Sequence, residues 1–508
     1  MKNDISRDTF NPAKRFARVL MQQGRVQLDA DFNEQTAIFW HYIRMLATDI
    51  IGPFGGPAAN LGFGILPRSG ETSHLTKREQ LRVGSDEDLK RLVSIAPSNT
   101  LSFIVMRGRY YVEGLLAEND ADFIYQTDGL KLSAGFIIYL DVWERHVSAL
   151  EDDSIREVAL GGPDTATRAQ LTWQIRIYTQ ENDNDRVPPN RDGEIKKPLG
   201  ALTAEEVWNG WQKYVDAFQP HNRGRLLARV ESGDGATANE PCIIHPDARY
   251  RGAENQLYRV EIHTGDNANT ATFKWSRENG SVTFPILEMN GGQARVAHLG
   301  RDAHLGLQVN DWVEVVDDER ALAQPAWPLL QVAEVRPMDS QVVLKAPSKG
   351  GLPVYKREDQ GKHPYLRRWD QRRDVNAEGV IVITKGSDKK NAGWIDLEDN
   401  VQIRFADPAN GSYRAGDYWL IAARTTTRDV EWPRDDKEEP LALPPHGVRH
   451  YYAPLALWLP GGVRSAESDS SSGKRARKEG AGSGTAQPAA NSPVLDLRRV
   501  FNSLTDTE

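Results

Sequence analysis

The stretch from Tyr250 to Leu287 carries a regular alternation of hydrophobic and polar residues. Between 256 and 263 every second residue is apolar (Tyr258, Val260, Ile262), and most of the intervening positions are charged or polar. Successive side chains of a strand point to opposite sides, so this pattern predicts a half-buried strand. The run 271–277 alternates in the same way, and Asn279-Gly280 suits the positive φ angles of a tight hairpin turn. We therefore expect three consecutive antiparallel strands, a meander.

The polar face of this meander gathers titratable residues. They are Arg259, Glu261, His263, Lys274, Arg277 and Glu278. No nucleophile, metal-ligand spacing or phosphate-binding loop accompanies them, so cross-strand ion pairs on a solvated sheet face are the favoured interpretation. The alternative is a hydrolase acting through Glu261, His263 and Glu278, which requires these side chains to converge in one pocket.

An amphipathic helix is expected near the N-terminus. Asp31 followed by Glu34 resembles a capping box, and the helical periodicity extends from there to about Ile50. The apolar positions of this helix fall on one stripe. They are Phe32, Phe39, Tyr42, Ile43, Leu46 and Ile50.

Most of the remaining chain has the pattern of short strands joined by turns. Alternating runs recur between 101 and 177 and again between 312 and 422, and shorter helices are expected at 86–93 and 203–220. The 13 tryptophans and 15 tyrosines favour strands, and the 42 glycines and 28 prolines favour turns. The sequence predicts a mainly β, multidomain protein with a few helices, built from antiparallel meanders and small barrels or sandwiches.

Length and turn signals divide the 508 residues into successive parts. They are an N-terminal arm and helix (1–70), a first β domain (71–200), a helix with the central meander (201–300), a small barrel-like insert (301–350), a C-terminal β domain (351–463), a disordered low-complexity linker (464–492) and a C-terminal docking peptide (493–508). The last part regains the apolar spacing of one or two helical turns.

Charge and cysteine content exclude several classes of protein. A net charge of -8 gives no broad attraction to nucleic acid or to anionic membranes. No apolar run is long enough to span a bilayer, and the first ten residues lack the apolar core of a secretion signal. The single cysteine, Cys242, excludes an intramolecular disulfide and a cysteine-rich zinc site. The acidic loop 181–194 resembles part of a calcium loop, but its glycine and glutamate are misplaced, so no metal or cofactor is expected.

Three tryptophans raise the question of sugar binding. Trp369 and Trp432 stand among charged residues, and Trp419 lies in an apolar run. Aromatic faces flanked by polar groups suit sugars, but a half-buried tryptophan that closes a sheet edge is the favoured interpretation.

Several long stretches of the chain resemble one family nearly end to end. Among them are SRDTFNPAKRF, GRYYVEGLLAEN, YLDVWERHVSALEDDSIREVALGGPDTATRAQLTWQ, RYRGAENQLYRVEIH, FKWSRENGSV, YRAGDYWLIAAR and RHYYAPLALW. On these stretches the chain resembles an uncharacterised bacterial family encoded in gene clusters for phage-tail-like contractile injection systems. The resemblance implies a component or cargo of such a particle, and it carries over no catalytic residues.

The leading hypothesis is therefore a non-enzymatic structural or assembly component at the spike, baseplate or tube lumen of a contractile particle. Extended arms and tails bind neighbouring subunits by strand addition or helix-in-groove docking, so both ends of the chain are expected contact segments. The expected contact residues are Phe10, Phe16, Arg25, Leu28, Phe32, Asn33, Leu497, Val500, Phe501 and Leu504. A carbohydrate-recognition module and a delivered hydrolase remain the alternatives.

The resemblance also implies partners and a location. The partners would be other subunits of the particle and further copies of the chain, of which a trimer would suit a spike or tip. Neither nucleic acid nor direct membrane insertion is expected. Assembly would take place in the cytoplasm, before the protein becomes part of a particle, or its cargo, that is released from the cell.

Overall fold

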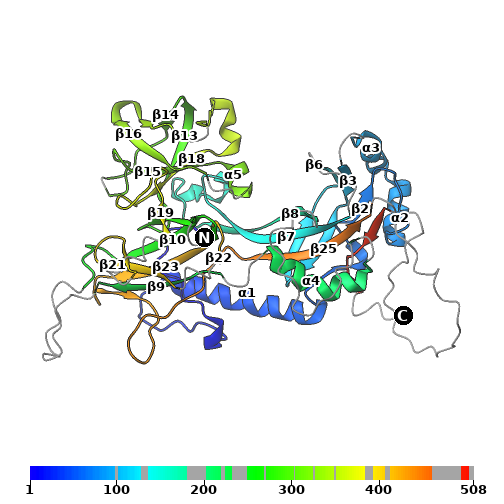
Figure 1. Cartoon of the computed structure of the whole chain (residues 1–508), viewed down its shortest axis with the longest axis horizontal. Helices are drawn as coiled ribbons and strands as arrows, with labels where there is room; N and C mark the ends of the chain where they lie inside the picture. The colour runs from blue at the N-terminus through cyan, green and yellow to red at the C-terminus, as the bar shows by residue number, and fades with distance from the viewer. Residues whose placement is uncertain are drawn as a thin grey trace. The chain divides into compact units, whose positions relative to one another are not determined.

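The computed structural model describes most of the chain (Figure 1). The described residues are 1–97, 101–127, 135–179, 199, 202–218, 223–231, 249–267, 270–302, 304–323, 327–347, 351–383, 393–406, 412–459 and 493–502. The predicted linker, the acidic loop 181–194, Cys242 and Leu504 lie outside them.

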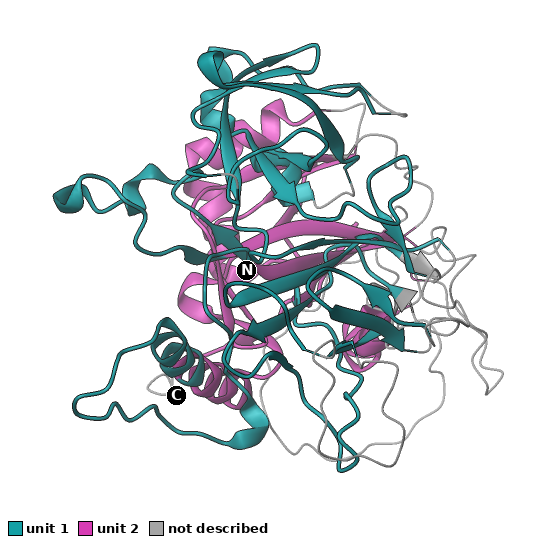
Figure 2. Ribbon diagram, turned by 90° about the vertical axis from the view of Figure 1, so that its left-hand side faces the viewer, with its two compact units in different colours: residues 1–38, 145–170, 220–449 teal, residues 39–144, 171–219, 450–508 magenta. Residues whose placement is uncertain are grey.

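The chain forms two compact units, each assembled from three separate stretches of sequence (Figure 2). Unit 1 comprises residues 1–38, 145–170 and 220–449, and unit 2 comprises residues 39–144, 171–219 and 450–508. The sequence predicted a linear succession of parts instead. Antiparallel sheets dominate the structure and a long helix stands near the N-terminus, so the predicted β-rich fold class is confirmed.

Unit 1 is built on a five-stranded sheet with the strand order β19-β12-β10-β23-β24. The predicted alternation is confirmed in β10, where Tyr258, Val260 and Ile262 are at most 1% exposed and pack into one hydrophobic core. A three-stranded sheet, β20-β21-β9, contributes to the same core. The bounds are β9 (Arg225–Val230), β10 (Gln256–Thr264), β12 (Thr272–Ser276), β19 (Ile381–Val382), β20 (Ile395–Asp396), β21 (Val401–Ala406), β23 (Tyr418–Arg424) and β24 (Asp429–Glu431). A two-stranded pair, β11 (Asp266–Asn267) with β22 (Ser412–Tyr413), completes this region.

The third strand of the predicted meander leaves this sheet. Asn279 and Gly280 both have positive φ, 51° and 69°, as a tight turn requires. The strand that follows pairs with β14 and β18 in a closed barrel, β13-β14-β17-β16-β15-β18, while β19 takes the place beside β12. The meander prediction was therefore wrong for its last strand, because local alternation does not specify a strand's partner. The bounds are β13 (Thr283–Asn290), β14 (Gln293–Val296), β15 (Trp312–Val316), β16 (Leu330–Arg336), β17 (Gln341–Leu344) and β18 (Tyr365–Trp369).

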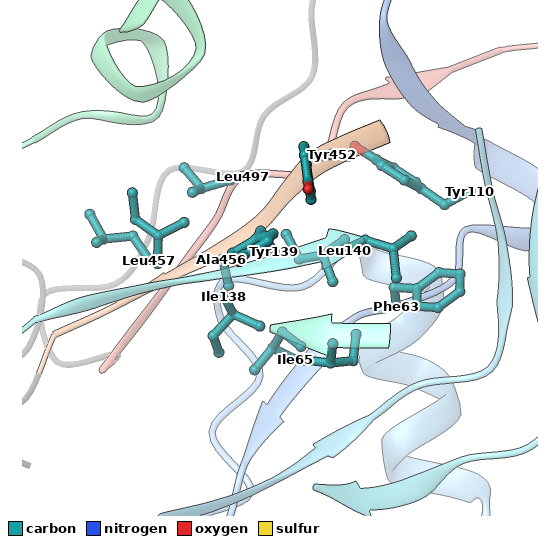
Figure 3. Packing of buried hydrophobic residues seen from close by; sticks show 14 of the residues in the cluster. Phe63, Ile65, Tyr110, Ile138, Tyr139, Leu140, Tyr452, Ala456, Leu457 and Leu497 are labelled. Atoms are coloured by element: carbon teal, nitrogen blue, oxygen red, sulfur yellow. The ribbon is translucent and has the colours of Figure 1, made fainter. Parts of the chain in front are cut away.

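Unit 2 contains three small sheets around a second hydrophobic core. Their strand orders are β27-β1-β4-β5, β2-β3-β6 and β26-β25-β7-β8. The bounds are β1 (Phe54–Pro57), β2 (Ile65–Pro67), β3 (Leu101–Val105), β4 (Gly108–Val112), β5 (Leu115–Asn119), β6 (Phe123–Thr127), β7 (Phe136–Val147), β8 (Arg168–Thr179), β25 (His450–Trp458), β26 (Val494–Asp496) and β27 (Val500–Phe501). Figure 3 shows part of the core, including Phe63, Ile138 and Leu497.

The predicted capping signals mark the start of α4 but not of α1, which begins at Asp29, so the predicted cap Asp31 lies inside the helix. In α4 (Ala204–Phe218), Glu206 N donates to Thr203 Oγ1 at 3.2 Å and Thr203 N donates to Glu206 Oε2 at 2.9 Å, as the predicted capping box requires. The other α-helices are α1 (Asp29–Ile51), α2 (Lys77–Ser85), α3 (Glu87–Ile95) and α5 (Asp318–Ala323). The sequence did not predict α2, although Thr76 and Glu79 form a complete capping box at its start. Among the described residues, no helix has the length and apolarity needed to cross a membrane.

Residues 493–502 of the C-terminal peptide are extended, so the helical turns predicted there were wrong. β26 pairs antiparallel with β25, and β27 pairs parallel with β1. The pairing begins at Leu459, whose N donates to Pro493 O at 2.7 Å. Leu497 is fully buried in the core of unit 2, so strand pairing and burial together outweigh the helical spacing of the sequence.

Arg498 anchors this peptide to unit 2. Its guanidinium is buried and forms a bidentate ion pair with Glu79, at 2.7 Å and 3.0 Å. It also bonds Asp496 at 2.7 Å and donates to Gly62 O at 2.9 Å. Planar, multiply bonded arginine–carboxylate contacts of this kind fix geometry as well as charge.

We expect Arg498→Met to destabilise unit 2 by about 3–5 kcal/mol, because Glu79 and Asp496 would keep their partly or fully buried charges without a partner. Chemical denaturation followed by circular dichroism measures the change. Arg109→Met is the matched control, since its ion pair with Glu118 is half exposed and contributes at most about 1 kcal/mol. Equal effects of the two substitutions would contradict the anchoring role.

Candidate functional site

The N-terminal arm, residues 10–28, exposes apolar side chains. Apart from the short 3₁₀ helix η1 (Pro12–Lys14), the arm has no regular secondary structure. Its exposed large apolar residues are Phe16, Leu20, Met21, Val26 and Leu28, between 44% and 81% exposed. Five exposed large apolar residues within one short stretch of sequence favour an interaction surface, whereas isolated exposed residues do not.

Hydrogen bonds fix the chain on both sides of the arm. Ser6 donates to the carboxylate of Asp29 through its N at 2.8 Å and through its Oγ at 2.7 Å. Thr9 Oγ1 donates to Glu34 Oε2 at 2.6 Å, and Arg7 Nη1 pairs with Glu431 at 3.1 Å. The arm is therefore a loop with anchored ends, whose apolar side chains remain exposed.

The predicted apolar stripe of α1 exists, and it is exposed as well. Phe32 is 75% exposed, and the residues from Phe39 to Ile50 on the stripe are each about half exposed or more. The buried residues of α1 are Ala30 and Ile38, which lie off the stripe. Of the 21 large hydrophobic residues exposed in the described part of the chain, 12 lie between residues 16 and 50. The apolar exposure is therefore concentrated in one stretch of sequence.

The predicted contact residues have different degrees of exposure. Phe16, Arg25, Leu28, Phe32 and Asn33 are exposed, and Phe10 is half-buried. At the other end, Val500 is exposed and Phe501 is half-buried. The prediction of Leu497 as a contact residue is corrected, because its side chain lies in the chain's own core and cannot reach a partner.

The charged face of β10 and β12 is buried, not solvated as the sequence suggested. Arg259, Glu261, His263 and Lys274 are all at most 5% exposed. Residues 1–4 lie across this face: Arg259 Nη1 donates to Met1 O at 2.9 Å, and Lys2 Nζ pairs with Glu261 at 3.1 Å. The expectation of an open face failed because the covering segment comes from more than 250 residues away in sequence.

Glu261 is the centre of this charged cluster. Its carboxylate contacts Arg259 Nε at 2.6 Å, Lys2 Nζ at 3.1 Å and Lys274 Nζ at 3.5 Å. Burial alone would raise the pKa of Glu261, but the three cations outweigh burial and hold the pKa well below its usual range. A carboxylate held in this way is a poor general base, so these contacts favour a structural role for the cluster.

The residues of the hydrolase alternative do not form one site. Glu261 and His263 share a face of β10, and burial lowers the pKa of His263 to about 4, so its imidazole is neutral at pH 7. Glu278 has other partners, since it lies 3.4 Å from His304 Nε2 at the turn after β12. Within the described residues, no group of histidine, cysteine and acidic side chains has an arrangement that could hold a metal ion.

The three tryptophans named in the sugar-binding alternative are buried, which counts against that alternative. Trp369, Trp419 and Trp432 are at most 7% exposed, so none presents a ring face to solvent. Their indole nitrogens donate within unit 1: Trp369 to Glu314 at 3.0 Å, and the other two to main-chain carbonyls at 2.9 Å. Trp369 also lies under the ammonium of Lys274, 4.3 Å from the ring centre, as a cation–π contact.

A cavity of about 340 Å³ opens on unit 2 and is lined by four arginines. Three of them are engaged in ion pairs: Arg82 and Arg107 with Asp86, at 3.5 Å and 3.4 Å, and Arg109 with Glu118 at 2.8 Å. The charges of the cavity are largely compensated by neighbouring carboxylates, so its chemistry points to no particular ligand.

A separate carboxylate, Glu398, has an unusual pKa. It pairs with Arg277 Nη2 at 2.8 Å, and the carboxylate of Asp370 lies 3.8 Å from Arg277 Nε. Burial, with the charge of Asp370 as a smaller cause, raises the pKa of Glu398 to about 7. No pattern in the sequence signalled this site, because its three charged groups are brought together only by the fold.

We expect Glu261→Gln to destabilise unit 1 by about 3–5 kcal/mol, because Arg259 would remain buried without its counter-charge and Lys274 would keep only Glu314. Chemical denaturation at pH 7 measures the loss. Glu288→Gln is the control, since Glu288 pairs with Arg295 at the surface. A loss no larger than that of the control would show that the cluster does not depend on Glu261.

We expect the stability difference between the wild type and Glu398→Gln to depend on pH. Between pH 4.5 and about 7 Glu398 is protonated in the folded state but ionised in the unfolded state. The contribution of Glu398 to the free energy of unfolding is therefore complete below pH 4.5 and is lost as pH rises through about 7. Relative to the variant, the wild type should lose about 3 kcal/mol over that range. Denaturation series at several pH values measure the difference, and a constant difference would contradict the raised pKa.

A family model matches the chain over residues 1–240 and 216–462. No curated protein and no solved structure matches the chain. Because the two matched ranges together include most of the 508 residues, the chain belongs to a family of unknown function (DUF6519).

Proposed function

We propose that this protein is a non-enzymatic structural or assembly component of a multi-protein particle, and that its N-terminal arm binds a neighbouring subunit. The observation that carries the proposal is the concentration of exposed apolar residues between residues 16 and 50. Apolar surface of this extent is unfavourable in water, and a partner that covers it would gain the corresponding hydrophobic free energy.

The anchored ends of the arm support a role in binding. Ser6 and Thr9 are bonded to the first residues of α1, which holds the loop close to the body of unit 1. A loop fixed at both ends loses less conformational freedom on binding than a free tail does. Residues such as Phe16 and Val26 can therefore contribute to affinity as anchors in apolar pockets of a partner.

The particle we propose is a phage-tail-like contractile injection system, with the protein at its spike, baseplate or tube lumen. This part of the proposal rests on the resemblance of the sequence stretches described above. The partners are then other subunits of the particle, and the protein assembles in the cytoplasm before the particle is released. The buried tryptophans do not favour the carbohydrate-binding alternative, and the separate partners of Glu261 and Glu278 do not favour the hydrolase alternative.

We expect Phe16→Asp combined with Val26→Asp to reduce co-purification of the protein with its particle by about tenfold or more, because two apolar anchors would be replaced by charges. Affinity-tagged particles from cells that carry the native gene cluster provide the measurement, with the amount of bound protein read by immunoblot.

The matched control is Val158→Asp combined with Leu160→Asp. Both residues belong to unit 1 and are 83% and 69% exposed, but they lie outside the arm. This variant should incorporate like the wild type. If both double variants incorporate fully, the arm is not the contact segment and the proposal fails.

A further inference from the structure

The exposed face of α1 has the spacing of a coiled-coil seam. Within unit 2, Phe39, Ile43, Leu46 and Ile50 follow one another at intervals of four, three and four residues and are 57–65% exposed. Alternating intervals of four and three place apolar residues along one line of a helix, where they pack into the spaces of a facing helix. Phe39 and Leu46 occupy the d positions of this repeat, and Ile43 and Ile50 occupy the a positions.

The opposite side of the helix is already committed to the chain's own fold. Arg44, at position b, donates to Glu113 O at 3.2 Å and to the hydroxyl of Tyr451 at 3.1 Å. The backbone is close as well, since a Cβ atom added to Gly114 would lie 2.4 Å from Arg44 O. The seam is therefore presented by a helix that is held from behind, and a partner need not order it first.

The nearly uncharged, apolar surface of the seam favours a partner helix with the same apolar surface. Among the a, d, e and g positions from Phe39 to Ile50, Asp49 carries the only charge. A strongly acidic or basic partner would gain little from such a face, whereas a second uncharged seam of the same spacing would match it. The α1 helix of another copy has that spacing by necessity, and two identical surfaces related by a two-fold axis form a closed contact.

The residue types favour two helices over three. Isoleucine at a with leucine at d, as in Ile43, Ile50 and Leu46, is the combination that parallel two-stranded coiled coils prefer, whereas isoleucine at both positions favours trimers. Phe39, at the other d position, belongs to neither pattern. With Tyr42 at a flanking g position, this face has five exposed apolar residues. At roughly 100 Å² of accessible surface each, they would bury about 1,000 Å² in a pair, the least that a specific interface is expected to bury.

We propose that two copies of this chain associate through parallel packing of their α1 helices along this seam. The inference deepens the proposed function, on which it rests, by naming one partner as a second copy of the chain. The arm remains the contact with other subunits, so the two interfaces use different residues.

Sedimentation velocity of the purified full chain, at concentrations up to tens of micromolar, tests the pairing. We expect a reversible dimer for the wild type. Ile43→Glu combined with Leu46→Glu should weaken the dimer by about 100-fold or more, because the two like-charged residues of each helix would face their counterparts. A wild type that is monomeric or trimeric, or a variant that dimerises like the wild type, would overturn the inference.

The matched control is Leu81→Glu combined with Ile95→Glu. Both residues are exposed on other helices of unit 2, so the variant should dimerise like the wild type. If it loses the dimer as the seam variant does, the effect is not specific to α1 and the inference fails.

A cysteine variant tests the parallel register directly. In a Cys242→Ser background, Leu46→Cys should form an intermolecular disulfide on mild oxidation, since d positions face each other across a parallel pair. Leu81→Cys should not. Absence of the Leu46→Cys cross-link would contradict the parallel arrangement.

The proposed function is tested separately, by co-purification with particles. A monomeric wild type that still enters particles would refute the seam and leave the assembly role intact. The wild type could also be monomeric while the seam variant fails to enter particles. That result would mean that α1 contacts a different subunit, and it would refute the pairing of two copies.

Discussion

Charge compensation away from water is the constraint on which unit 1 depends. Its central sheet carries arginine, glutamate and lysine on the face opposite to the hydrophobic core, and residues 1–4 cover that face. Such a surface is stable only if each buried charge meets an opposite one, and Glu261 meets three cations at once. The start of the chain is therefore part of the fold, and the exposed arm begins only after these contacts are complete.

The same N-terminal region combines tight anchoring with exposure. Residues before and after the arm are fixed by short hydrogen bonds, while the arm itself and one face of α1 leave apolar side chains in water. A fold that needed only to hide its hydrophobic residues would not leave this arrangement uncovered. A covering surface on other molecules would explain this exposure, in keeping with the assembly role proposed above.

The sequence predicted local structure well, but it predicted less well which distant segment pairs with or covers each element. Alternation correctly assigned the inward residues Tyr258, Val260 and Ile262, and Asn279-Gly280 correctly marked a tight turn, since both signals act within a few residues. The partner of β13, the cover over Glu261 and the main-chain bond from Leu497 to Leu455 depend on segments far away in sequence, and no local pattern encodes them. The sequence also predicted the apolar stripe of α1. Periodicity alone cannot distinguish an apolar helix face that is buried in the fold from one that is exposed.

The pairing of β25 with β26 has a consequence for how the chain tolerates change. The main-chain contact between Leu459 and Pro493 closes this pair at 2.7 Å, so the two residues that flank the connection in sequence are held side by side. The entropic cost of joining two fixed points grows only with the logarithm of the length of a flexible connection, by roughly 0.6 kcal/mol for each doubling. A change in the number of residues between β25 and β26 should therefore alter the stability of this strand pair only slightly.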